Sequence, residues 1–133
     1  MSWAEIFIVF FISHLVGDFI LQTDRQARYK FGGLSGDRRA RNALFSHVFT
    51  YTLAFVPALI WIGSHEGAVA AIVIGFAVAI PHLVIDDGRL LELYMRKVKR
   101  CPQPLPDNLV MAVDHSTHLI MLWATALLAV AIG

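Results

Sequence analysis

The stretch GAVAAIVIGFAVAIPHLVID, from Gly67 to Asp86, decides the fold class of this chain. Its length matches the ~20 residues that an α-helix needs to cross the hydrocarbon core of a bilayer. Three further apolar stretches of similar length run from Trp3 to Thr23, from Ala43 to Gly63 and from Leu109 to Ile132. Short connections make successive helices antiparallel. The sequence therefore predicts an all-α membrane protein, with residues 1–133 forming one antiparallel bundle of four transmembrane helices.

The composition supports this class. Hydrophobic residues make up 57% of the chain and charged residues only 16%, and the mean hydropathy is +0.63. A soluble globule has a more polar balance than this. The formal net charge of +1 predicts no nucleic-acid partner, and the single cysteine, Cys101, excludes an intramolecular disulfide.

Basic residues predict the orientation of the helices. All 11 lysines and arginines lie in two alternate connections, Asp24–Asn42 and Asp87–Asn108. The positive-inside rule places these connections in the cytoplasm and both termini outside. The stretch Arg89–Arg100 alternates apolar and basic residues as a short interfacial amphipathic helix does. Its charges fit two roles equally, orientation in the membrane or binding of lipid headgroups.

Ionisable side chains recur inside the predicted spans, where each costs several kcal/mol. Three pairs have i, i+4 spacing, which places both members on one helix face. They are His14 with Asp18, His82 with Asp86, and Asp114 with His118, and the second span adds His47 with Tyr51. The antiparallel path brings all four sets to one layer in the cytoplasmic half of the bilayer. His65 belongs to the outer turn, and His115 lies about 100° from the face of Asp114 and His118.

Imidazole and carboxylate together suit a divalent metal. We expect zinc first, with manganese or iron as alternatives, and the number of donors leaves room for a binuclear centre. The predicted metal-binding residues are His14, Asp18, His47, His82 and His118. Asp86 and Asp114 are predicted to be catalytic, by bridging, orienting or acting as general base. The alternative is that these residues are hydrogen-bonded packing groups.

Four motifs carry a family resemblance: HLVGDFILQTD from His14, HVFTY from His47, HLVID from His82 and DHSTH from Asp114. Together they resemble the small bacterial and phage membrane proteins of domain-of-unknown-function family 3307. The chain is also loosely similar to membrane-bound metal-dependent hydrolases. The resemblance implies that the four motifs form one site, in a protein of the bacterial inner membrane.

The first functional hypothesis is a metal-dependent hydrolase of a lipid or lipid-linked substrate at the cytoplasmic face. Gln22, Arg25, Arg28 and Tyr51 are predicted to bind the substrate or its phosphate headgroup. A second hypothesis is a metal-ion or proton transporter, which four helices could form only as a homo-oligomer. Haem ligation and a purely structural membrane role are the remaining alternatives.

Overall fold

The computed structural model describes all residues 1–133, and it contains helices and no strand. Most elements are α-helices, and η1 is a π-helix that continues α1. The elements are α1 (Trp3–Leu15), η1 (Val16–Ile20), α2 (Asp24–Tyr29), α3 (Arg38–Ala54), α4 (Val56–Glu66), α5 (Ala68–Asp86), α6 (Arg89–Lys97) and α7 (Asp107–Ile132). The predicted all-α class is confirmed.

Three helical segments are long and apolar enough to cross a membrane: Trp3–Ile20, Ala68–Asp86 and Asp107–Ile132. The pair α3 and α4 passes the same test as one unit, although it is bent by 50°. Three candidate spans, or four with the bent pair, indicate a membrane protein. The arrangement of all four as transmembrane helices stays a prediction.

The helix ends differ from the predicted ones for local reasons. The first span ends at Ile20 instead of Thr23, because Thr23 caps α2 by accepting a hydrogen bond from the Gln26 backbone. In place of one span over 43–63, α3 begins at Arg38 after the capping side chain of Asp37. The bend lies at Phe55, since Pro57 has no N–H to continue the hydrogen-bond ladder of α3.

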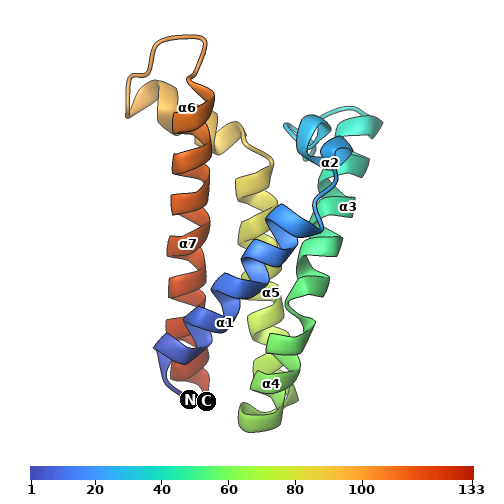
Figure 1. Cartoon of the computed structure of the whole chain (residues 1–133), viewed down its shortest axis with the longest axis vertical. Coiled ribbons are helices and arrows are strands. Elements are labelled where there is room, and N and C mark those ends of the chain that lie inside the picture. The colour runs from blue at the N-terminus through green and yellow to red at the C-terminus, as the bar shows by residue number, and fades with distance from the viewer.

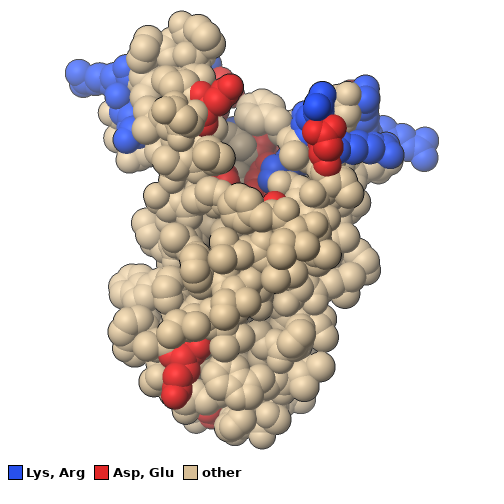
Figure 2. All heavy atoms as spheres, in the orientation of Figure 1, with Lys and Arg blue, Asp and Glu red and all other residues tan.

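The two ends of the molecule differ in chemistry. The termini and the α4–α5 turn lie at one end, and α2 and α6 lie at the other (Figure 1). Figure 2 shows the basic side chains gathered at the α2 and α6 end, in two lobes with a hollow between them. A cluster of buried apolar side chains fills the half toward the termini and includes Ile6, Phe10, Ile62, Ile74 and Ala126. The buried polar residues His14, His47, His82, Asp86 and His118 therefore lie outside this apolar core, toward the other end of the bundle.

The predicted amphipathic helix is present as α6. Its Met95 is buried against the protein, whereas Leu90 is 60% exposed and Tyr94 is 45% exposed. Arg96 and Lys97 stand in its last turn. Exposed apolar and basic side chains on one short helix are typical of a segment lying in a membrane interface.

Candidate metal centre

The candidate site forms where η1, α3, α5 and α7 approach one another at the polar end of the bundle. His14 comes from the end of α1, His47 from α3, His82 from α5 and His118 from α7. Each of these four imidazoles is at most 2% exposed. Asp18 and Asp86 are buried beside them, with side chains only 7% and 1% exposed. Two carboxylates and four imidazoles thus share one buried site.

The π-helix η1 places Asp18. Its wider turn is closed by a hydrogen bond from the Leu21 N–H to the Val16 carbonyl, five residues earlier, with an N to O distance of 2.9 Å. Gly17 lets this segment approach α3 closely, because a Cβ there would lie 2.6 Å from Cδ2 of Tyr51. The close approach brings Asp18 Oδ1 to 3.2 Å from His47 Nε2 on α3.

A proline and a threonine support the α5 side of the site. Pro81 stands inside α5, directly before His82, and its missing N–H leaves the Ala77 carbonyl without its usual helical partner. The Thr125 hydroxyl of α7 lies 3.4 Å from that carbonyl and 2.8 Å from the Met121 carbonyl of its own helix, so its one proton is shared between the two acceptors. This contact joins α5 and α7 one turn away from His82.

Four ligand-type atoms converge in what we call the first ligand group: Asp18 Oδ1, His47 Nε2, His82 Nε2 and Asp86 Oδ2. All lie within 4.8 Å of one another. The two Nε2 atoms are 3.2 Å apart, and the nitrogen to oxygen distances run from 2.7 Å (His47 to Asp86) to 3.6 Å (His82 to Asp18). Zinc bonds of about 2.0–2.1 Å place tetrahedral ligand atoms about 3.3 Å apart. The spacing therefore fits one tetrahedral ion.

A second ligand group consists of Asp86, Asp114 and His118. Asp86 Oδ1 lies 3.5 Å from His118 Nε2, and Asp114 Oδ2 lies 3.5 Å from His118 Nδ1. Asp86 belongs to both groups and turns one oxygen toward each. Asp86 would thus offer one oxygen to an ion in each group.

Unpaired buried atoms test whether the residues fit a metal. Asp18 Oδ1 and His118 Nε2 are buried and have no hydrogen-bond partner of good geometry. Such atoms are costly in a protein interior. A divalent ion in each ligand group would satisfy both, so the donor set fits. His82 Nδ1 is also buried without a partner, so no hydrogen bond fixes its ring; the flat stack on Tyr51 does that instead, with centroids 3.4 Å apart.

The comparisons with known proteins identify the family. The model of a family of proteins of unknown function, DUF3307, matches residues 6–132. The chain belongs to this family. Neither the curated proteins nor the solved structures gave a match, so the site of this DUF3307 protein is assigned from its own geometry.

The structure of the DUF3307 chain separates His14 from the converging atoms. Its Nδ1 lies 3.2 Å from Asp18 Oδ2 and 3.2 Å from the Tyr51 hydroxyl. His14 thus stands behind Asp18, on the side opposite His47, and belongs to neither ligand group. Its geometry suits a residue that orients the Asp18 carboxylate.

The predicted headgroup residues are distributed unevenly. Gln22 lies at the site: with its amide oxygen turned inward, that oxygen is 2.8 Å from Lys30 Nζ and 3.3 Å from His47 Nε2. Tyr51 is buried beneath the site, at 1% exposure. Arg25 and Arg28 are exposed on α2, and Arg28 pairs there with Asp24. The structure therefore does not bring either arginine to the ligand groups.

Lys30 is the residue that the sequence did not single out. Its Nζ lies 2.8 Å from Asp86 Oδ2, and its side chain is only 20% exposed. Lys30 comes directly after α2 in the first connection, outside every predicted span and outside any helical repeat that links it to His82 or Asp86. Only the folding of the connection over the end of α5 makes it part of the site.

Proposed function

We propose that this DUF3307 protein is a metal-dependent hydrolase, embedded in the bacterial inner membrane, that acts on a lipid or lipid-linked substrate at the cytoplasmic face. The observation that carries the proposal is the convergence of Asp18, His47, His82 and Asp86 at tetrahedral distances inside an apolar bundle. Four membrane crossings, with both termini outside, would place this site in the cytoplasmic half of the bilayer.

Each residue of the site has a distinct role in this proposal. His47, His82, Asp18 and Asp86 would hold one divalent ion, zinc first, and His118, Asp114 and Asp86 would hold a second. His14 and Gln22 orient the ligands. A bound divalent ion supplies Lewis-acid polarisation of an ester or phosphoester and a water nucleophile at neutral pH. Asp114, whose side chain is 27% exposed, is the carboxylate best placed to take a proton from that water.

The apolar core favours hydrolysis over transport. Between the ligand groups and the termini, the buried cluster consists of apolar side chains such as Phe10, Phe55 and Leu122. A proton or metal ion crossing the bundle needs polar groups along its path. The geometry instead suits a site that is reached from one side only.

Elemental analysis and a turnover assay test this function together. We expect stoichiometric zinc, manganese or iron in the purified protein, and metal-dependent hydrolysis of a member of a phospholipid and lipid-phosphate panel. Asp114→Asn should keep the ion of the first ligand group, which Asp114 does not belong to, and lower turnover by about 10²–10⁴-fold, the usual contribution of a general base. Asp24→Asn, on the exposed outer face of α2, is the matched control. Absence of metal contradicts the proposal, and metal-dependent ion flux into proteoliposomes without hydrolysis replaces it with transport.

A further inference from the structure

A cavity at the polar end of the bundle opens onto the ligand groups. It measures about 600 Å³ and lies between α2, α5, α6 and the first turns of α7. Figure 2 shows it as the hollow between the two charged lobes, with acidic and basic atoms at its floor. Lys30, Asp86 and Asp114 line the floor, and apolar side chains such as Phe31, Leu91 and Met111 line the walls. We call this cavity the vestibule; its volume is within the ~300–1,000 Å³ of small-molecule sites.

A mostly apolar groove adjoins the vestibule. It measures about 690 Å³ and lies between α5, α6 and α7, and Ile85 and Leu91 line both spaces. Along α7 it runs from Leu109 to Ile120, a length of about 16 Å at 1.5 Å per residue. We call it the chain groove. The groove and the vestibule thus adjoin at the side chains of Leu91 and of Ile85, which is next to Asp86 on the same helix.

Lys30 has donor capacity left for a ligand. An ammonium group has three N–H donors. One donor serves Asp86 Oδ2 and a second serves the Gln22 oxygen, each across 2.8 Å. The third has no partner in the protein, and Lys30 lines the vestibule.

The carboxylates around the vestibule are mostly engaged elsewhere. Asp86 contacts Lys30 and three histidines, Asp114 contacts His118, and Glu92 pairs with Arg96 across 3.3 Å. Asp107 lies at the mouth, in the first turn of α7. Lys30 is the one basic side chain that lines the vestibule, beside four carboxylates, and ions in the two ligand groups would add positive charge there.

We infer that the vestibule and chain groove together bind an anionic single-chain amphiphile, with its phosphate or carboxylate on Lys30 and its hydrocarbon chain between α5 and α7. The inference rests on the proposed function and narrows its substrate class. The phosphate or carboxylate would then lie beside Asp86 and Asp114. The proposed hydrolysis requires the bond that is cleaved to lie at the same place. The chain would remain in apolar surroundings throughout.

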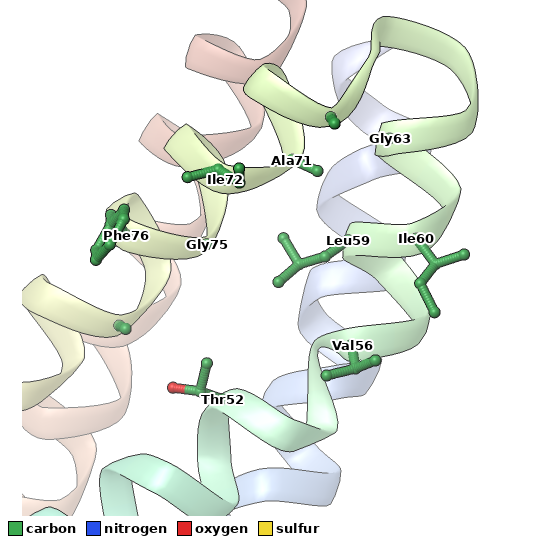
Figure 3. A pocket seen from close by; sticks show the side chains of 11 residues that line it. Thr52, Val56, Leu59, Ile60, Gly63, Ala71, Ile72, Gly75 and Phe76 are labelled. Atoms are coloured by element: carbon green, nitrogen blue, oxygen red, sulfur yellow. The ribbon is translucent and has the colours of Figure 1, made fainter.

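Photolabelling with hexadecyl phosphate that carries a diazirine in its chain tests this inference on the full-length, zinc-supplemented protein in detergent. We expect labels on residues of the chain groove, such as Ala112 and Thr117. Ala112→Trp fills the groove from an exposed position and should lower labelling about tenfold. Ala68→Trp is the matched control, because it fills a separate apolar groove between α4 and α5 (Figure 3), and it should leave labelling unchanged.

Competition with unlabelled amphiphiles identifies the chemistry of the head group that the vestibule binds. Unlabelled hexadecyl phosphate or palmitate should displace the probe, whereas hexadecyltrimethylammonium and inorganic phosphate should not, and Lys30→Met should abolish the preference for the anion. Labels confined to other surfaces, or equal displacement by the cationic amphiphile, would overturn the inference. Metal content, measured on the same samples, separates the two proposals: a full complement of metal without groove labelling rejects only the amphiphile, whereas absence of zinc, manganese and iron rejects the metal centre.

Discussion

Asp86 connects more of the site than any other side chain of the bundle. Its Oδ2 meets Lys30, His47 and His82, and its Oδ1 faces His118. Because all of these partners are buried or nearly so, the negative charge of Asp86 balances the site whether or not a metal is bound. Loss of that charge leaves Lys30 without its main counterion in apolar surroundings.

Asp86→Asn should therefore destabilise the protein strongly. Breaking a buried ion pair by removing one partner costs about 3–5 kcal/mol, and we expect a clear fall in thermal unfolding temperature in detergent. Asp24→Asn removes one partner of an exposed pair, with side chains 70% and 76% exposed, and should cost less than about 0.5 kcal/mol. Equal unfolding temperatures for the two variants would show that Asp86 carries no such charge balance.

His82→Ala should lower metal affinity, because its Nε2 faces two carboxylates and a second imidazole of the first ligand group. We expect at least the 10–100-fold loss that changes around metal ligands produce, as a rough lower bound. Competition with a chelator measures this loss. His65→Ala is the control, since His65 is exposed and contacts only Ser64 and Trp61; similar chelator sensitivity in both variants would exclude His82 as a ligand.

At the scale of helices, the spacing of η1 from α3 decides where Asp18 lies. Gly17→Ala places a Cβ 2.6 Å from Tyr51 Cδ2 and 3.3 Å from its Cα, so the two helices must separate. Overpacking of this kind costs about 1–3 kcal/mol, and we expect a lower unfolding temperature together with weaker metal binding. Gly75→Ala, whose new Cβ meets Leu59 only at 3.4 Å, should be neutral or stabilising. Unchanged metal binding in Gly17→Ala would mean that Asp18 is not held by this contact.

The helical elements were largely predictable, because long apolar runs and i, i+4 polar pairs are properties of the chain itself. The pairs on α5 and α7 occupy one level, as the antiparallel path of the helices indicated. Two features required the tertiary structure. Lys30 reaches Asp86 from a polar connection, across 56 residues of sequence, and no periodicity relates the two. Arg25 and Arg28 carry the same charge in the same connection but are exposed on α2, so charge alone could not separate them from Lys30.

At the scale of the whole molecule, charge is polarised along the bundle. Figure 2 shows lysines and arginines at the α2 and α6 end, while the apolar body carries only a few acidic side chains toward the termini. Moving such an end through the hydrocarbon is far more costly than moving the opposite one. The difference predicts a single orientation in the membrane.

Alkaline phosphatase fused after Gly133 should accordingly be active, because that position is expected outside the cytoplasm. A fluorescent protein inserted within Ser35–Asp37 should be fluorescent, because that position is expected inside. Alkaline phosphatase and a fluorescent protein at the same positions give opposite readouts and control for expression. Cytoplasmic activity of the C-terminal fusion would contradict the orientation, and with it the cytoplasmic access to the vestibule.

Because of the π-helix, the same sequence motif adopts two different backbone conformations in this chain. His14–Asp18 and His82–Asp86 both read H-x-x-x-D, yet the first pair enters a turn closed over five residues and the second lies in a regular α-helix. Accordingly, His82 and Asp86 both belong to the first ligand group. Asp18 belongs to it too, but His14 contacts Asp18 from outside the group. A search template built on residue spacing alone would treat the two as equivalent. Because the five-residue turn of η1 contains one residue more than an α-turn, deleting one residue from Val16–Ile20 would restore an α-turn with little rotation of α1, whereas the same deletion in α5 would rotate one part of that helix by about 100° relative to the other. Alignments of distant relatives should therefore tolerate a one-residue gap at this segment and penalise the same gap in α5.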